Sequence, residues 1–320
     1  MSALVSSVSS RRRSSVSTRM VGAAVGLLAD RALGEPPSEI HPVAAFGRLM
    51  TSLEAATYAP TRPAGARYAA LGLGLGYGVG MLLPTAVVVE LAAAGNALRG
   101  AAVEVRDALA ASDLDRARAL VPTLVGRDPS ALDPSGLAAA VIESLAENTV
   151  DAVVAPVWWA VVGGSGAGSA YRAVNTMDAM VGHHSERYED FGWASARLDD
   201  VANYVPARLT ALLTACVRPG AAKQIAHAVR AHAPAHPSPN AGVAEAAFAA
   251  ALAVELGGPL RYGTRAEDRP RLGVGPRPVV DDIDRAVELA SHVELALVGI
   301  LLSGGLAGGL LGRRRRSGTR

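Results

Sequence analysis

The stretch YAALGLGLGYGVGMLLPTAVVV occupies residues 68–89 and contains no charged side chain. It lies between Arg67 and Glu90, and it reaches the roughly 20 apolar residues that a helix needs to cross a bilayer. Because an uncharged segment of this length is typical of a membrane-spanning helix, it predicts an α-helical membrane protein.

Two further segments extend this pattern. Residues 152–171 carry no charge, and residues 295–312 are followed directly by Arg313 to Arg316. A basic cluster directly after an apolar helix indicates the cytoplasmic side, so we expect a cytoplasmic C-terminus. The fold predicted is all-α, a polytopic helical bundle in the cell membrane with about three to five crossings. Weaker apolar segments carry charges and predict amphipathic, re-entrant or protein-buried helices: residues 21–33, 205–217 and 241–256.

The composition of the whole chain agrees with this class. Of 320 residues, 50% are hydrophobic and only 19% are charged, which excludes a disordered chain. A net charge of +2 gives no basic field for nucleic acid. The single cysteine, Cys216, excludes an intramolecular disulfide and a cysteine-cluster metal site, and its apolar neighbours predict a buried thiol.

Glycines alternate with larger residues inside the first apolar segment. A glycine-rich run can bind phosphate, but no strand precedes this one and no Lys-Ser or Lys-Thr pair follows it. Gly72, Gly76 and Gly80 instead share one face of a helix at a spacing of four. This face predicts close helix packing.

The chain divides into three parts. Residues 1–19 are rich in serine and arginine and predict a disordered basic tail, residues 20–312 predict a single membrane-embedded helical domain, and residues 313–320 predict a basic cytoplasmic tail. Within the domain, residues 90–142 have apolar positions at helical spacing and predict soluble amphipathic helices, with turns at Asp128-Pro129 and Asp133-Pro134.

Three carboxylates precede the second apolar segment. Glu143, Glu147 and Asp151 are spaced by four residues and share one face of a continuous helix. Like charges at this spacing repel, and an unpaired charge at the mouth of an apolar span costs on the order of several kcal/mol. A divalent cation or a cluster of arginines would offset this repulsion. The alternative is an acidic first turn favoured by the helix dipole, which accounts for Asp151 but poorly for Glu143.

A segment dense in polar groups follows the second apolar segment. Its arginines supply planar forks suited to phosphate or carboxylate. The adjacent His183 and His184 point in different directions on a helix and make a poor metal pair. So many ionisable groups between apolar stretches predict a polar ligand site, formed from Arg172, Asn175, Asp178, Gly182, His183, Arg187, Arg197, Asp199, Asp200, Asn203 and Arg208.

Two outlying motifs are candidates for the same site. His41 follows a turn at Pro36-Pro37, after Asp30 and Glu35. The sequence HPSPNAG (236–242) opens a helix at Asn240. Ordinary helix capping is the alternative role of this second motif.

Several strings resemble a known family. ESLAENTVD (143–151), YRAVNTMD (171–178), ERY (186–188) and FGWASARLDD (191–200) match its patterns in order, followed by residues 236–242. The chain resembles the CobD/CbiB family of cobalamin biosynthesis, the adenosylcobinamide-phosphate synthases, from about residue 22 to residue 311. It departs from the family pattern at Glu35, where aspartate is usual, and at His183-His184.

The resemblance implies an integral membrane enzyme. It would join the free propionate carboxylate of adenosylcobyric acid to aminopropanol or its phosphate, forming an amide with ATP and magnesium. Membrane lipid and other enzymes of the cobalamin pathway are the further partners expected, and nucleic acid is not.

Roles follow for the polar residues under this resemblance. We expect Glu143, Glu147 and Asp151 to hold magnesium, and Glu147, Asp178 or His183 to take part in catalysis. The remaining candidates are expected to bind substrate: Arg172, Asn175, Arg187, Arg197, Asp199, Asp200, His41 and Asn240. A membrane sensor of the AmpE-like type, a permease or a pathway scaffold remains the alternative, because intramembrane charges also mark transport paths.

Overall fold

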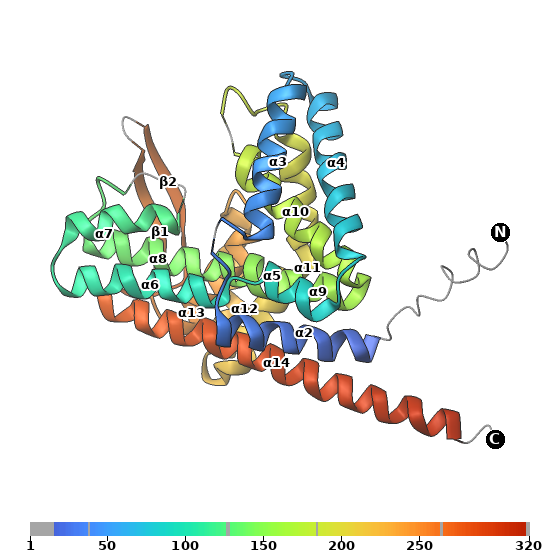
Figure 1. Ribbon diagram of the computed structural model, residues 1–320. Helices are drawn as coiled ribbons and strands as arrows, with labels where there is room; N and C mark the ends of the chain where they lie inside the picture. The colour runs from blue at the N-terminus through green and yellow to red at the C-terminus, as the bar shows by residue number, and fades with distance from the viewer. Residues whose placement is uncertain (1–15, 38, 126–128, 184, 263–264, 318–320) are drawn as a thin grey trace.

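The computed structural model describes residues 16–317 except 38, 126–128, 184 and 263–264. This part of the chain is helical almost throughout, with one antiparallel hairpin (Figure 1). The first half contains α2 (Val16–Leu33), α3 (Pro42–Thr57), α4 (Arg62–Gly80), α5 (Thr85–Ala92), α6 (Gly95–Ala110), α7 (Leu114–Leu120), the 3₁₀ turn η1 (Val121–Thr123) and α8 (Pro134–Thr149).

The second half begins with a π-helix, η2 (Val150–Val154). It continues with α9 (Ala155–Gly163), α10 (Ser165–Val181), α11 (Trp193–Val217), η3 (Pro219–Ala221), α12 (Ala222–Ala231), η4 (Ala233–Ala235), α13 (Ala241–Leu252), β1 (Leu256–Tyr262), β2 (Arg265–Leu272) and α14 (Val280–Ser317). The all-α prediction is confirmed apart from the hairpin, whose register runs from Leu256 opposite Leu272 to Tyr262 opposite Arg265.

The prediction of one spanning helix over residues 68–89 is wrong. Helix α4 ends at Gly80, and α5 begins at Thr85, directly after Pro84. Proline lacks a backbone N–H, and it also disfavours helical geometry in the residue before it. The uncharged segment therefore forms two helices joined by a turn.

The prediction of one spanning helix over residues 152–171 is also wrong. Helix α9 ends at Gly163 and α10 begins at Ser165, with Gly164 between them at φ +85°. Only glycine adopts such backbone geometry without strain. The chain therefore reverses here, and α10 packs against α9.

Two helical segments of the described chain are long and apolar enough to cross a membrane, Thr85–Ala110 and Val280–Leu310. The first comprises α5 and α6, which are separated by the non-helical Ala93 and Ala94. The second contains most of the predicted segment 295–312, which is thus confirmed as an apolar helix.

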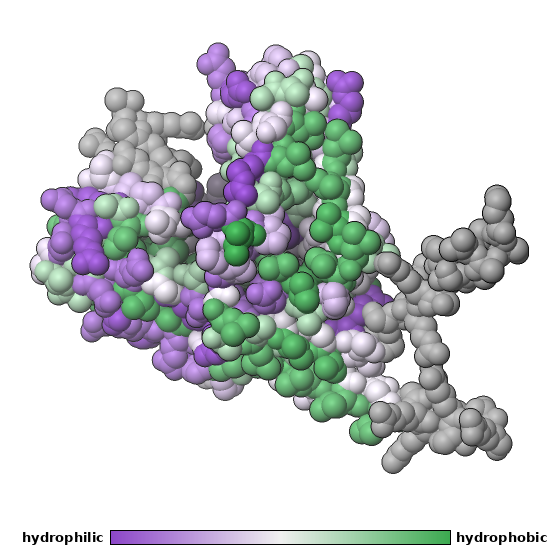
Figure 2. Space-filling model, in the orientation of Figure 1, coloured by the Kyte–Doolittle hydropathy of each residue, from purple (hydrophilic) through white to green (hydrophobic). Residues whose placement is uncertain are grey.

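Large apolar side chains are exposed on several helices. Figure 2 shows them gathered over the adjacent α2 and α14 and over α4. An exposed apolar surface of this extent is typical of a protein that contacts lipid or a partner. The exposed residues include Val25, Leu28, Leu71, Leu75, Val79, Leu82, Ile300, Leu306 and Leu310.

The glycine face of α4 packs as predicted. A side chain at Gly76 would lie 2.6 Å from the Cβ atom of Ala173, and one at Gly80 would lie 2.5 Å from that of Ser169. Gly72 faces Met177 in the same way. These glycines therefore let α4 and α10 approach closely.

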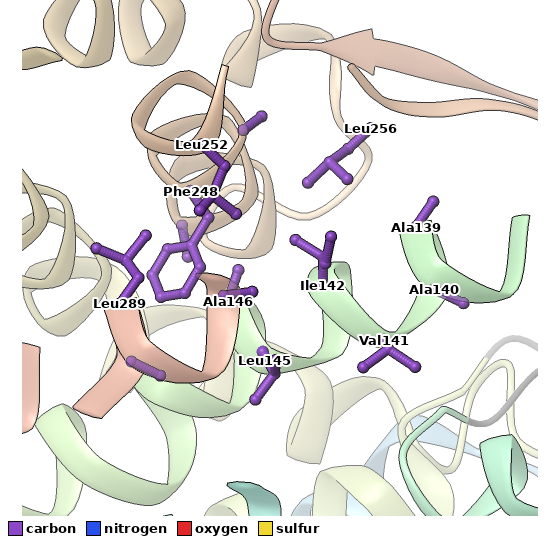
Figure 3. Packing of buried hydrophobic residues seen from close by; sticks show 14 of the residues in the cluster. Ala139, Ala140, Val141, Ile142, Leu145, Ala146, Phe248, Leu252, Leu256 and Leu289 are labelled. Atoms are coloured by element: carbon purple, nitrogen blue, oxygen red, sulfur yellow. The ribbon is translucent and has the colours of Figure 1, made fainter. Parts of the chain in front are cut away.

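The largest core surrounds α8 and α13, as Figure 3 shows in close view. Leu145 of α8 and Phe248 of α13 are fully buried, and Leu289 of α14 and Leu256 of β1 complete the packing. Both α8 and α13 are buried over most of their length, which places them inside the protein. This core fixes the C-terminal end of α8, where the polar residues begin.

Two smaller predictions need correction. Val16–Arg19 belong to α2 rather than to a disordered tail, and Arg313–Arg316 continue α14 rather than forming a separate tail; residues 1–15 and 318–320 lie outside the described residues. Cys216 is exposed, because it lies on the outer side of α11. Helices α6 and α7 confirm the helices predicted within residues 90–142, but α6 lies within the candidate span Thr85–Ala110, so the prediction that this region is soluble is not confirmed. Asp133 caps α8 by accepting the N–H of Gly136 at 2.7 Å.

Candidate functional site

Polar side chains from four segments meet beside the core. The π-helix η2 supplies Asp151, α10 supplies side chains at helical spacing, and α11 supplies a second such set, while the turn before α13 closes the group. Residues three or four apart share one face of a helix, so each helix presents several groups to the same place. The α10 set is Tyr171, Asn175 and Asp178, and the α11 set is Asp199, Asp200 and Asn203.

Amide side chains link the carboxylates. The Nδ2 atom of Asn175 donates to Asp151 Oδ2 at 3.1 Å and to Asp199 Oδ1 at 3.3 Å. Asn203 Nδ2 donates to Asp199 Oδ2 at 2.9 Å, and the Tyr171 hydroxyl donates to Asn203 Oδ1 at 2.9 Å. We call these five residues the carboxylate network. Since Asn203 and Tyr171 are buried, their hydrogen bonds hold Asp199 in one orientation.

A small cavity adjoins the carboxylate network. It has a volume of about 30 Å³, which is room for a water molecule or a small ion. Its polar lining comes from α8, η2, α11 and the turn before α13: Glu147, Asp151, Asp199, Asn203, Ser238 and Asn240.

Glu143 lies apart from this cavity. It is buried, and its Oε1 accepts the backbone N–H of Gly257 in β1 at 2.9 Å. The sequence predicts three carboxylates on one continuous α-helix, but the π-helix begins at Val150 and changes the register at Asp151. Glu147 and Asp151 therefore line the cavity, whereas Glu143 anchors the hairpin.

Asp178 carries a strongly shifted acidity. Its pKa is raised from 3.8 to about 7, first by removal from water and then by the negative charges of Asp199, Asp200 and Glu147. Its carboxylate lies over Gly182, where an added Cβ would come within 1.8 Å of Asp178 Oδ1. Gly182 therefore leaves the space that the Asp178 side chain occupies.

The neighbouring carboxylates shift in the same direction. Burial raises the pKa of Asp199 to about 6, although the hydrogen bonds from Asn175 and Asn203 lower it. Burial and the charge of Asp199 raise the pKa of Asp151 well above its ordinary value. The titrations of the three acids are therefore coupled, since ionisation of one raises the pKa of the others.

Asn240 ties the turn before α13 to α11. Its Nδ2 donates to the carbonyl oxygen of Asp200 at 2.7 Å, and its Oδ1 accepts from Arg208 at 3.1 Å. The side chain makes no capping hydrogen bond to α13, so the capping alternative is wrong for Asn240. Arg197 forms an exposed ion pair with Asp200 at 3.5 Å.

Arg172 joins the carboxylate network from the other side. Its Nη1 donates to Asn175 Oδ1 at 3.2 Å. Its buried Nε has no hydrogen-bond partner among the described residues. Arg172 is therefore a cation beside the carboxylates with an unused donor.

Three predicted site residues are engaged elsewhere. Arg187 donates to Glu54 at 2.9 Å and stacks on Tyr58, so it fastens the segment before α11 to α3. His183 packs edge-on against Tyr188, and His184 lies outside the described residues. His41 caps α3, with its Nδ1 accepting the N–H of Val43 at 3.2 Å. The structure does not join these residues to the carboxylate network.

The carboxylate oxygens at the cavity are ligands suited to a hard cation, but their positions do not form a coordination site. Within the residues that the structure describes, no group of three or more His, Cys, Asp or Glu side chains is placed to hold a metal ion. Carboxylate oxygens are nevertheless ligands that magnesium prefers, and a bound cation would relieve the burial and like-charge repulsion that raise the pKa values of Asp151 and Asp199. A cation bound between Asp151 and Asp199 would have the carboxylate of Glu147, which lines the same cavity, as a candidate third ligand.

The polar segment predicted from the sequence includes Asn203, but neither Asn203 nor Tyr171 nor Ser238 is given a role there. Tyr171 precedes Asn175 by four residues, and Asn203 follows Asp199 by four, so helical spacing was the signal for both. Ser238 accepts the backbone N–H of Ala241 at 3.1 Å, which shapes the turn at the cavity. Ser238 lies inside the candidate motif 236–242, but no helical spacing marks it individually.

Fold and site together define a helical protein with exposed apolar helices and a buried set of carboxylates and amides. The model of the family described as CobD/Cbib protein matches residues 23–290. The chain therefore belongs to the CobD/CbiB family.

Relatives of this family cover most of the chain. The cobalamin biosynthesis protein CobD of Mycobacterium tuberculosis (strain CDC 1551 / Oshkosh) is 46% identical over 87% of this chain and 93% of its own length. The protein of the same name from Chromobacterium violaceum is 42% identical over 84% of this chain and 91% of its own length. No solved structure matches the chain. These relationships support a role in cobalamin biosynthesis.

Proposed function

We propose that this protein forms an amide bond in cobalamin biosynthesis. The substrates would be the free propionate carboxylate of adenosylcobyric acid and the amine of aminopropanol or aminopropanol phosphate, with ATP as the source of activation. The observation that carries this proposal is the carboxylate network, in which one amide, Asn175, binds both Asp151 and Asp199.

Amine attack requires loss of a proton. An amine arrives as an ammonium ion, which the negative charges of the network attract. Asp178, with a pKa of about 7, is ionised above neutral pH and then accepts one proton from that ammonium. Asp199 already accepts hydrogen bonds on both oxygens, so it orients the amine rather than taking its proton.

Activation of the carboxylate requires a leaving group. Attack of the carboxylate oxygen on the γ-phosphorus of ATP gives an acyl phosphate and ADP. Attack of the amine on the acyl carbon then forms the C–N bond and releases phosphate. Positioning and charge neutralisation dominate such transfers, and Arg197 is exposed beside Asp200 where it can meet a phosphate.

Magnesium would be held by Glu147, Asp151 and Asp199 at the small cavity. When bound there it would supply positive charge that neutralises phosphate oxygens. Glu143 is not part of this proposed set, because its carboxylate binds the Gly257 N–H.

The chain is proposed to sit in the cell membrane as a multi-pass protein. The candidate spans Thr85–Ala110 and Val280–Leu310 supply the crossings, and Arg99 of one pairs with Glu294 of the other. Charges within membrane spans persist when they are paired in this way.

The test is turnover by the full chain purified in detergent. Adenosylcobyric acid, ATP, magnesium and either aminopropanol or its phosphate are supplied, and the corrinoid is followed by chromatography and mass spectrometry. The expected product has gained the amine and lost one carboxylate charge. Asp199→Asn should abolish it, whereas Asp115→Asn, which alters a fully exposed carboxylate, should not.

Unchanged corrinoid in the wild-type reaction, with both amines, refutes the proposed amide formation. Full turnover by Asp199→Asn refutes the assignment of the reaction to the carboxylate network.

A further inference from the structure

An apolar groove of about 310 Å³ lies next to the carboxylate network. It is formed by α3, α4, α5 and α10, and its only polar lining residues are Ser169, Arg172 and Thr176, all on α10. The glycine face holds α4 against α10, while α3 lies beside them with Ala45 and Leu49 exposed at the groove. The volume is at the lower end of the range for ligand pockets.

Arg172 is the residue shared by the groove and the carboxylate network. It lines the groove, and its Nη1 donates to Asn175, which in turn binds both Asp151 and Asp199. Its buried Nε–H has no acceptor, and although the charge of Arg172 acts on Asp151, no direct ion pair of Arg172 is found among the described residues. A guanidinium placed in this way favours an anion, because an unpaired buried donor is unfavourable.

The two sides of Arg172 therefore differ in charge. The carboxylate network attracts a cation and repels a carboxylate, while the groove offers apolar surface and one positive group. We propose that the groove binds an apolar, methyl-bearing edge of the corrinoid and that Arg172 receives the carboxylate that reacts. This inference rests on the proposed function and deepens it. The amine would bind at Asp151 and Asp199, and the reacting corrinoid carboxylate would bind at Arg172, with Asn175 between the two substrates.

An acyl chain of a membrane lipid is the other candidate occupant. It would fill apolar space equally well, and exposed Leu75 and Val79 lie at the same groove. An uncharged chain, however, leaves the Nε–H of Arg172 unpaired. A ligand that combines apolar surface with a carboxylate satisfies both features, so we favour the corrinoid.

Equilibrium binding separates this inference from turnover. Adenosylcobyric acid is titrated into the full chain in detergent without ATP or amine, and binding is read from the corrinoid absorbance. A second probe is the same corrinoid with its reacting carboxylate converted to an amide. Ala45→Phe fills the groove from its exposed side, and Ala56→Phe, on the same helix but outside the groove, is its matched control.

Ala45→Phe should weaken binding of both probes by about tenfold or more, since a bulky side chain occupies the apolar space. Ala56→Phe should bind both like the wild type. Arg172→Gln should weaken binding of adenosylcobyric acid by about tenfold and leave the amide probe unaffected, since only the former carries the charge that Arg172 pairs with. Arg172→Lys should restore part of the loss.

Wild-type affinity of Ala45→Phe for both probes overturns the groove assignment. Equal weakening of both probes by Arg172→Gln overturns the pairing with the carboxylate. A lipid that copurifies with the wild type but not with Ala45→Phe, at unchanged corrinoid affinity, overturns the inference in favour of the acyl chain. If the binding results hold but no amide forms, the proposed function fails while the corrinoid site stands.

Discussion

Replacement of Asp178 by asparagine should make the stability of the protein less dependent on pH. The pKa of Asp178 in the folded protein is about 7, against 3.8 in an unfolded chain. Between these values the folded state holds a proton that the unfolded state has lost, so folding is favoured at low pH. This contribution declines as pH rises and is lost above about pH 7.

The size of the effect follows from the two pKa values. Their difference corresponds to at most about 4 kcal/mol, of which about 3 kcal/mol is lost between about pH 5 and pH 8.5. Asparagine cannot ionise, and its amide also removes a negative charge that faces Asp199 and Asp200. The melting temperature of Asp178→Asn should therefore rise relative to that of the wild type as pH increases, by about 4–5 °C.

The measurement is thermal unfolding of the full chain in detergent, at about pH 5 and about pH 8.5, with magnesium removed by a chelator. Asp115→Asn is the control, since the carboxylate of Asp115 is fully exposed. If Asp178→Asn and the wild type lose stability in parallel across this interval, the raised pKa and its cause are both wrong. In turnover, the wild-type rate should rise through pH 7 and the variant should be inactive, because asparagine cannot accept the proton.

Three further predictions test other parts of the structure. Glu147→Gln should abolish product formation while leaving the protein folded, because one proposed magnesium ligand has lost its charge. Magnesium should raise the melting temperature of the wild type at high pH but not that of the variant. Normal turnover by the variant would exclude this metal assignment. Glu143→Ala should destabilise the protein by about 1–3 kcal/mol, measured by denaturant unfolding, since the Gly257 N–H loses its acceptor, and Glu143→Gln should recover most of this; an unchanged midpoint would contradict the anchoring role. Asn203→Ala should raise the pKa of Asp199, because Asp199 loses a donor, and should therefore slow turnover below about pH 7, where Asp199 must stay ionised to attract the ammonium; unchanged turnover at low pH would separate Asn203 from the reaction.

The helices themselves could be predicted from the sequence, but their ends could not. Absence of charge identifies residues 68–89 and 152–171 as apolar, and both are helical over most of their length. A count of apolar residues ignores Pro84 and Gly164, which interrupt both segments. Of the three predicted spanning segments, the one at residues 295–312 has no such interruption, and α14 confirms it as an apolar helix.

The site could be predicted wherever its residues share one helix. Spacing places Asn175 and Asp178 on one face of α10 and Asp199 and Asn203 on one face of α11. The partner of Glu143 could not be found in this way, because Gly257 lies 114 residues away and belongs to a hairpin whose strands show no simple alternation. Contacts between distant elements depend on packing, which local spacing does not record.

The amide side chains explain how so many carboxylates remain together and why one of them is suited to proton transfer. Both oxygens of Asp199 receive an amide N–H, and Asp151 receives one, so their charge is partly satisfied within the protein. Among the described side chains none donates a hydrogen bond to Asp178, and burial together with neighbouring negative charges raises its pKa to about 7. Because no described side chain satisfies its carboxylate, Asp178 is free to exchange a proton near neutral pH, whereas the amides hold Asp151 and Asp199 in fixed orientations. A side chain at residue 182 could bring a hydrogen-bond donor to Asp178, but its Cβ would lie 1.8 Å from Asp178 Oδ1. Gly182 therefore keeps the Asp178 carboxylate both unclashed and without a donor from this position.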